Sequence, residues 1–299
     1  MRKPLVGAFA GALFGAAALA ATTATASAGT PHDAGAAGHH TAAKAAKHAQ
    51  HPAAEPDFSG TVALDNCSGS LVKMPDSKAG DPALVLSNGH CLSEGMPQAG
   101  EVVVDKDTQR DFKLLDAKGG EKGTVSASKI AYATMTDTDV SLYRLDSTYK
   151  DIKSKYGIDP LEIDAAHPKQ DSKITVVSGY WKEKYGCSVD GFVPELREAD
   201  WKMKDSIRYT SECNTKGGTS GSPIIANDSG KVVGINNTRN EDGEKCTMNN
   251  PCEVDKNGKV SVHKGIGYGQ ETYLFTKCMA AGNKLDLNKE GCALPKPKS

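Results

Sequence analysis

The feature that most limits how this chain can fold is its cysteine set, eight residues that all lie between positions 67 and 292. No pair has the C-x2-C spacing typical of zinc sites, and the closest two are separated by five residues. An even count of this kind predicts four disulfides formed in an oxidising compartment. Eight cysteines allow 105 pairings on sequence alone. Their order along the chain favours pairing of neighbours: Cys67 with Cys91, Cys187 with Cys213, Cys246 with Cys252, and Cys278 with Cys292.

The N-terminus also indicates an oxidising compartment, because it has the features of a secretory signal. Arg2 and Lys3 precede an apolar run over residues 5–20, and Ala26-Ser27-Ala28 offers the small residues that a signal peptidase reads. A membrane anchor is the alternative, but the run is short and rich in Ala and Gly, whereas a span needs about 20 strongly apolar residues. We therefore expect residues 1–28 to be a secretory signal. We also expect a secreted, extracellular protein without a membrane partner after cleavage.

Residues 29–56 contain ten alanines and five histidines but no large apolar residue. A segment with nothing to bury cannot offset the entropy of ordering, so it is predicted to be a disordered leader or propeptide. Loose metal binding is the alternative, but the histidine spacing matches no usual zinc pattern. The five histidines are His32, His39, His40, His48 and His51. We assign no metal site and no cofactor from the sequence.

The remaining residues, 57–299, read as a β-rich domain. The net charge of −1 argues against a nucleic-acid binder that relies on charge. With 31 Gly and 14 Pro, the chain has many turn signals between short strand-like runs. This pattern predicts an all-β protein of antiparallel sheets, arranged as a sandwich or as barrels. The expected strands are Thr61–Leu64, Gly69–Lys73, Ala83–Ser87, Glu101–Val104, Gly123–Ala131, Val140–Leu145, Lys173–Ser178, Ser206–Thr210, Pro223–Ile225, Lys231–Ile235 and Lys259–Val262.

Two other segments interrupt the strand pattern. The stretch Thr148–Gln170 is polar and predicts a link between two strand-rich halves, at about 57–147 and 171–299. Near the C-terminus, Leu274, Phe275, Cys278 and Met279 share one helical face, which predicts a short helix ended by Gly282.

Three short motifs carry chemistry. In residues 86–91, L-S-N-G-H-C, His90 follows an apolar strand and precedes Cys91. In residues 139–145, Asp139 heads an alternating strand. In residues 213–223, Ser220 lies among glycines that free the backbone and let a ligand approach peptide N–H groups. This last run leads into a strand and lacks the G-x-S-x-G pattern, which disfavours a phosphate loop and a lipase-type elbow.

Taken in order, these motifs resemble those of the trypsin/chymotrypsin family of serine proteases. C-S-G-S-L-V at 67–72, His90-Cys91, D-V-S-L at 139–142 and G-T-S-G-S-P at 218–223 correspond to that family's motifs, and the last resembles the bacterial glutamyl-endopeptidase branch. The resemblance covers essentially all of residues 57–299. It implies two antiparallel six-stranded β-barrels of the chymotrypsin type with a short C-terminal helix.

The resemblance also implies roles for individual residues. Ser220 is the expected nucleophile of a secreted endopeptidase, His90 its general base, and Asp139 the carboxylate that orients His90. The N–H groups of Gly218 and Ser220 are the expected oxyanion hole. By the same resemblance, Cys67 and Cys91 form a disulfide next to His90. The expected partners are polypeptide substrates, and the protein is expected to be a monomer.

Two positions depart from the digestive enzymes of the family. No Ile-Val-Gly-Gly start is visible near Asp57, and Thr219 replaces the Asp that precedes the nucleophile. Activation through an ion pair with a new N-terminus is therefore not expected. Asp137 is a rival for the role of Asp139, but the D-[IV]-x-L register favours Asp139.

Substrate preference is predicted from three pocket positions: Asn214, Thr215 and Asn236. Asn214 stands where trypsins carry an Asp, so a preference for Lys or Arg is not expected. Thr215, with Lys216 and Arg239 nearby, favours a small polar or acidic side chain. Asn236 stands where many glutamyl endopeptidases carry a His, which argues against a full match to that branch.

Two other functions fit the same motifs. One is a catalytically silent binding module that kept the scaffold, and the other is an esterase that uses the same acyl chemistry. The intact triad argues against the binding module. His167 and His263, which lie outside the motifs, are expected to have surface or packing roles.

Overall fold

The computed structural model describes residues 55–298. The predicted signal peptide and nearly all of the predicted leader lie outside the described residues. Within the described part, no helix has the length and apolar character needed to cross a membrane.

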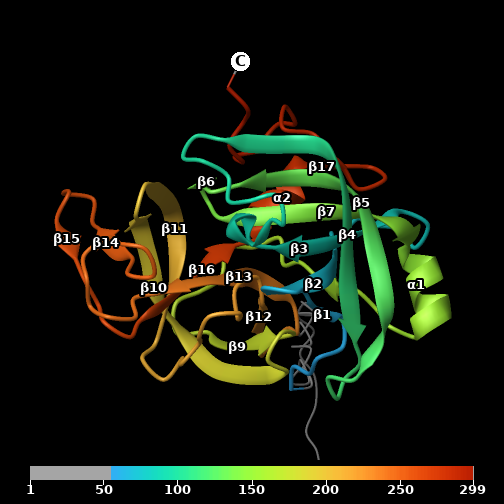
Figure 1. Ribbon diagram of the computed structural model, residues 1–299, viewed down its shortest axis with the longest axis horizontal. Coiled ribbons are helices and arrows are strands. Elements are labelled where there is room, and N and C mark those ends of the chain that lie inside the picture. Colours follow the sequence, from blue (N-terminus) through green and yellow to red (C-terminus); the bar gives the residue numbers. More distant parts are fainter. Residues whose placement is uncertain (1–54, 299) are drawn as a thin grey trace, which may run out of the picture. The chain divides into compact units, whose positions relative to one another are not determined.

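Six strands close into a first antiparallel barrel, because β1 pairs with both β4 and β2 (Figure 1). Around the ring, the strands are β1 (Thr61–Ala63), β4 (Val102–Leu115), β5 (Glu121–Thr134), β7 (Val140–Thr148), β3 (Pro82–Ser87) and β2 (Ser68–Lys73). A short strand, β8 (Leu161–Glu162), adds to β2 in parallel.

A second antiparallel barrel closes through the pairing of β10 with β11. Its strands, in ring order, are β10 (Glu183–Glu198), β9 (Lys173–Ser178), β12 (Pro223–Ala226), β13 (Val232–Arg239), β16 (Gly267–Glu271) and β11 (Trp201–Tyr209). Two strands extend it beyond β10, namely β14 (Cys252–Val254) and β15 (Val260–Ser261). β6 (Thr136–Asp137), which lies between two first-barrel strands in sequence, pairs in parallel with β11. The predicted fold class, two six-stranded barrels, is confirmed.

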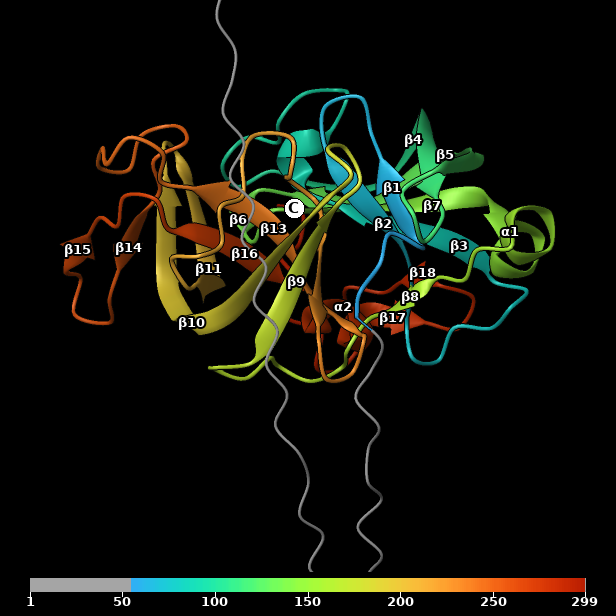
Figure 2. The ribbon, with the colours of Figure 1, turned by 90° about the horizontal axis from the view of Figure 1, so that it is seen from below.

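Few residues are helical. A 3-10 turn, η1 (Gly89–Cys91), follows β3, and α1 (Tyr149–Tyr156) follows β7. α2 (Tyr273–Cys278) follows β16 and leads into a small sheet of β17 (Met279–Ala280) and β18 (Lys284–Leu285). Figure 2 shows α1 beside the first barrel and the β14–β15 extension at the far end of the second.

The period-two alternation of strand side chains separates two cores. In β3, Ala83 and Val85 face the interior of the first barrel, while Leu84 and Leu86 belong to a core shared by both barrels. This shared core also contains Val177 from the second barrel. The barrels are therefore joined by buried apolar contact, and the hydrophobic effect stabilises their pairing.

The four disulfides join neighbouring cysteines as the chain order predicts. No cysteine is free among the described residues. The bond between Cys67 and Cys91 joins the start of β2 to η1 and so fixes the segment that carries His90.

Several elements differ from the sequence predictions. β10 was not predicted because it contains glycine, proline and several charged residues. β4 is far longer than the expected Glu101–Val104 because the first half of this strand is exposed or half-buried on both faces. Lys259–Val262 contains only the two-residue β15. The polar stretch that begins at Thr148 starts with α1, whose capping box of Thr148 and Asp151 is the signal that could have identified it.

The C-terminal helix is present but shorter than predicted. It ends at Cys278, and Met279 already has extended backbone angles as the first residue of β17. Gly282 therefore does not end the helix. The prediction relied on the apolar character of Met279. Met279 is indeed buried in the core shared by the barrels, but it reaches this core as the first residue of a strand and not as part of the helix.

Candidate active site

His90 lies at the edge of the first barrel, in the turn that follows β3. Its neighbour Gly89 packs so closely that a Cβ atom there would stand 2.3 Å from the carbonyl oxygen of Thr134. Only glycine fits without moving the backbone. This close packing, together with the Cys67–Cys91 disulfide, holds the turn against the end of β5 and next to Asp139.

Asp139 immediately precedes β7 and is 1% exposed. Its Oδ2 lies 2.7 Å from Nδ1 of His90, and its Oδ1 accepts the backbone N–H of His90 at 3.0 Å. Its carbonyl accepts the side-chain N–H of Asn88 at 2.8 Å. The carboxylate is thus held in one orientation, with both oxygens directed to one residue.

Asp137 has different surroundings, although it is only two positions away. It adopts a left-handed backbone conformation, with a φ of 60°, and pairs with Nζ of Lys204 at 2.9 Å. It does not contact His90. The structure therefore brings Asp139, rather than Asp137, to the imidazole.

The pKa of His90 is raised above its ordinary value of 6.5. Burial alone would lower it, but the charge of Asp139 and the hydrogen bond to it outweigh burial, and the charge of Glu198 adds to the rise. His90 therefore holds a proton more readily than a free imidazole does.

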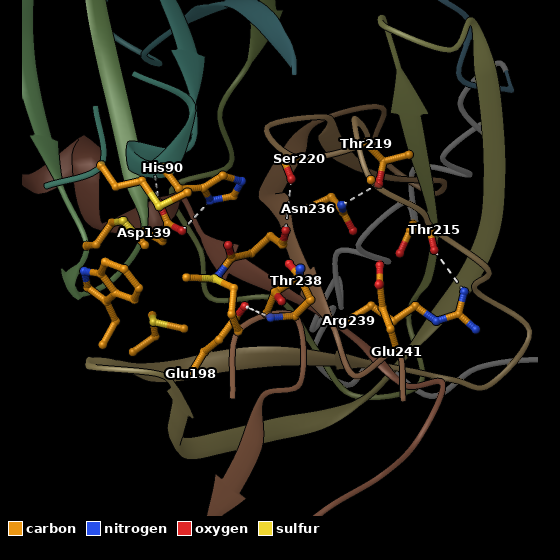
Figure 3. Close-up of a pocket in the computed structure, with 18 of the residues that line it drawn as sticks. His90, Asp139, Glu198, Thr215, Thr219, Ser220, Asn236, Thr238, Arg239 and Glu241 are labelled. Atoms are coloured by element: carbon orange, nitrogen blue, oxygen red, sulfur yellow. Dashed lines mark hydrogen bonds and ion pairs between the residues drawn. The ribbon is translucent and has the colours of Figure 1, made fainter. Parts of the chain in front are cut away.

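Ser220 lies in the loop between β11 and β12. Its Oγ donates to the carbonyl oxygen of Asn237 at 3.3 Å, and no hydrogen bond joins it to His90 among the described residues. Both side chains nevertheless line one cavity (Figure 3). The fold brings the predicted triad to one site, with the hydroxyl turned toward Asn237.

The loop around Ser220 depends on unusual backbone angles. Gly221 has a φ of 77°, and a Cβ atom there would lie 2.2 Å from both Ser87 Oγ and the carbonyl oxygen of Ser68. The first barrel supports the loop directly: Ser68 N–H donates to the Ser220 carbonyl at 2.8 Å, and Ser68 Oγ donates to the Gly218 carbonyl at 3.1 Å.

The predicted oxyanion-hole residues have free backbone donors. In the described part of the chain, neither the Gly218 N–H nor the Ser220 N–H has a protein acceptor, whereas the Thr219 N–H donates to the Lys216 carbonyl at 3.0 Å. Two such donors beside a nucleophile can stabilise a developing negative charge.

The predicted pocket residues have separate positions. Thr215 and Asn236 line the cavity, and Asn236 donates to Oγ1 of Thr219 at 3.0 Å. Asn214 does not line the cavity. It is exposed, and its Oδ1 accepts from Arg239 at 3.2 Å, while the Thr215 carbonyl accepts from the same guanidinium at 2.9 Å.

Sequence reasoning missed Glu198, the last residue of β10. It is 9% exposed, lines the cavity and accepts the backbone N–H of Asn249 at 2.8 Å. Burial raises its pKa, and that hydrogen bond partly opposes the rise. A single Glu at a strand end carries no sequence signal, which explains the omission.

An apolar group of side chains that line the same cavity was also missed. It consists of one tryptophan and four methionines that come from four separate segments, namely Trp201, Met203, Met96, Met135 and Met248. Only the fold brings them together.

The two remaining histidines lie away from this cavity. His263 is 41% exposed and stands 3.8 Å from Glu253. His167 lies between Asp205 and Glu271, at 3.2 and 2.8 Å.

Comparison with known proteins gives one family and many similar folds. The sequence pattern of a trypsin-like peptidase domain matches residues 67–235. Among solved structures, the MamO protease domain from Magnetospirillum magneticum is 14% identical, with a TM-score of 0.44, and the match covers 72% of this chain and 92% of that one. The active form of the Rv3671c protease from M. tuberculosis is also 14% identical, with a TM-score of 0.44 and coverage of 81% and 84%.

A third structure, Nocardiopsis protease, is 12% identical, with a TM-score of 0.41 and coverage of 73% of this chain and 93% of its own. No curated protein matches the sequence significantly.

Proposed function

Because this chain belongs to the trypsin-like peptidase family, we propose that it is a secreted serine endopeptidase in which Ser220 is the nucleophile. His90 is the general base, and Asp139 orients it. The observation that carries the proposal is the paired contact of both Asp139 oxygens with His90, beside a cavity that Ser220 also lines.

The chemistry follows from these positions. Ser220 Oγ attacks the carbonyl carbon of the peptide bond while its proton moves to Nε2 of His90. The Gly218 and Ser220 N–H groups stabilise the resulting oxyanion. The C–N bond then breaks, and His90 gives the proton to the leaving amine. Water, deprotonated by His90, hydrolyses the acyl-enzyme and restores the hydroxyl.

The Ser220 hydroxyl must turn from Asn237 to His90 before it can react. The hydrogen bond from Ser220 Oγ to the Asn237 carbonyl oxygen, which must break first, is long, at 3.3 Å. Catalytic hydrogen bonds are often poorly aligned without substrate and tighten when substrate binds. We expect the Ser220–His90 hydrogen bond to form in the complex with substrate.

A fluorophosphonate probe tests the proposal. The mature protein should be modified at Ser220 alone, and Ser220→Ala should abolish both labelling and peptide hydrolysis. Ser222→Ala is the matched control because Ser222 is a buried serine in the same loop, and it should keep both. Absence of labelling in the folded protein would favour a binding module, while turnover of esters but not peptides would favour an esterase.

We further propose a preference for an acidic or small polar side chain, as in the glutamyl-endopeptidase branch. Arg239 lines the cavity and has no carboxylate partner among the described ion pairs, whereas Lys216 is paired with Glu183 at 2.9 Å. An unpaired guanidinium at a cavity wall favours an anionic substrate group. Asn236, in place of a His, remains a departure from that branch.

A peptide-library digest measures this preference. Cleavage after Glu or Asp should dominate, and Arg239→Gln should lower kcat/KM for those peptides more than for neutral ones. Cleavage chiefly after Lys or Arg would refute the preference but would leave the proposed endopeptidase activity standing.

Secretion is part of the proposed function. Its support is the predicted signal at residues 1–28 together with four disulfides, which persist in oxidising compartments. Expression with the native N-terminus should release a shortened, oxidised protein into the medium.

A further inference from the structure

We propose that His167, Asp205 and Glu271 form a binding site for a divalent transition metal, with Zn²⁺ as the best fit. None of the three lines the active-site cavity. The inference is independent of the proposed peptidase activity.

Three separate segments supply the side chains. His167 lies in the segment between the barrels, Asp205 lies in β11 and Glu271 ends β16. Nε2 of His167 is 3.2 Å from Oδ2 of Asp205 and 2.8 Å from Oε1 of Glu271. The three donor atoms all lie within 4.8 Å of one another. Ligands bound about 2.0–2.2 Å from a tetrahedral zinc stand about 3.3 Å apart, so small shifts admit the ion.

The second observation is the state of Glu271. Its side chain is 3% exposed, and neither carboxylate oxygen has a hydrogen-bond partner in the described structure, even though Oε1 points at His167. Its one ion-pair partner among the described residues is His167. A buried carboxylate without hydrogen bonds is costly, and a cation between these donors would remove the cost.

His167 is oriented as a metal ligand requires. Its Nδ1 lies 2.7 Å from the carbonyl oxygen of Pro168, so Nδ1 carries the hydrogen and Nε2 is left to face the two carboxylates. Metal-ligating histidines usually donate their second ring N–H to such an acceptor. The ring also packs against Phe192 and Tyr273, with centroids at 4.4 and 5.3 Å.

The alternative to a metal is a proton held within the cluster, on His167 or on Glu271, because burial and the charge of Asp205 raise the pKa of Glu271 to about 9. A single N–H on Nε2 of His167 can point well toward only one carboxylate oxygen. A cluster held by one proton therefore leaves Oε2 of Glu271 without a partner. A metal ion instead uses all three donors. One imidazole with two carboxylates suits Zn²⁺, whereas Ca²⁺ prefers oxygen ligands alone.

Zinc at this place would tie the segment between the barrels to two strands of the second barrel. His167 and Asp205 are 39% and 49% exposed at the side chain, so the ion can enter from solvent and keep water as a fourth ligand.

Zinc content and thermal stability test the site in the full-length protein. Residues 29–56 contain five further histidines, so the informative quantity is the difference between variants. His167→Gln and Glu271→Gln should each bind one Zn²⁺ fewer per chain than wild type by mass spectrometry of the dialysed protein. His263→Gln is the matched control because it removes an exposed histidine near a single carboxylate, and it should match wild type.

Melting temperature supplies the second measurement. Zn²⁺ at about 100 times its Kd should raise the wild-type Tm by roughly 5–10 °C and leave both variants unchanged. Glu271→Gln keeps the size of the side chain and introduces no charge, so it should melt no lower than wild type in EDTA, which shows that it folds. Equal zinc content in wild type and variants, or no rise in Tm, would overturn the proposal. Tighter binding of Ca²⁺ than of Zn²⁺ would overturn the choice of metal.

Discussion

Asp139 and Asp137 differ by two positions in sequence, and their contacts differ completely. One carboxylate is buried against His90 and the other forms a surface ion pair with Lys204. If Asp139 orients the general base, Asp139→Asn should lower kcat by about 10⁴-fold, because the imidazole then takes the wrong tautomer.

Asp137→Asn, its control, should change kcat little. Steady-state kinetics on a peptide substrate measures both variants. Loss of activity in Asp137→Asn with retention in Asp139→Asn would reverse the assignment.

The raised pKa of His90 predicts how activity depends on pH. A general base accepts a proton only when it is neutral, so kcat/KM should rise with pH through the pKa of His90, at a midpoint above 6.5. Because the charge of Glu198 contributes to the rise, Glu198→Gln should move this midpoint to lower pH. The pH profile of kcat/KM is the measurement.

Glu241→Gln is the control for charge in the same cavity, because Glu241 is exposed and does not act on His90. Its midpoint should equal that of wild type. A midpoint that rises or stays fixed in Glu198→Gln would contradict the electrostatic role given to Glu198.

The loop that carries Ser220 depends on Gly221 more than on its other glycines. A methyl group at 221 meets Ser68 and Ser87 at 2.2 Å and imposes a side chain on a left-handed backbone. Gly221→Ala should therefore lower both Tm and kcat/KM. Gly217→Ala should retain both within a few-fold, since a Cβ atom at 217 meets nothing within 4 Å. Equal effects of the two changes would show that the close packing at 221 is unimportant.

The strands that were predicted well and those that were missed differ in burial. β3 and β9 are buried at nearly every position, and each contains a short run of apolar and β-branched residues that a sequence pattern reveals. β10 is the longest strand, but it contains glycine, proline and many charged residues, and pairing with β9, β11 and β14 holds it in place. Long-range partners of this kind cannot be read from a local pattern.

The same contrast applies to the candidate active site. His90, Asp139 and Ser220 could be predicted because each lies in a short motif whose neighbours are also unusual. Glu198 lies in no such motif, and neither do Trp201 and the four methionines that line the cavity. Only the fold places these side chains at the cavity. The His167 cluster likewise joins three segments that are far apart in sequence.

The two barrels are joined by a core that includes the C-terminal tail. Leu294 is 3% exposed in this core, and the next residue, Pro295, accepts a hydrogen bond from Tyr132 at 3.0 Å. Leu294→Ala should lower the free energy of unfolding by about 2–5 kcal/mol, as expected for a buried leucine. Urea denaturation measures the change. Lys298→Ala, at an exposed position of the same tail, should have no effect, and equal stability of both variants would place the tail outside the cooperative fold.

The bonds from Ser68 to the loop of Ser220 carry a consequence for the timing of activity. The second barrel bears the proposed nucleophile, but the first supplies the donors that fix its carbonyl and that of Gly218. A chain whose two barrels have not docked lacks these contacts. We therefore expect the proposed peptidase activity to appear only after the barrels have assembled.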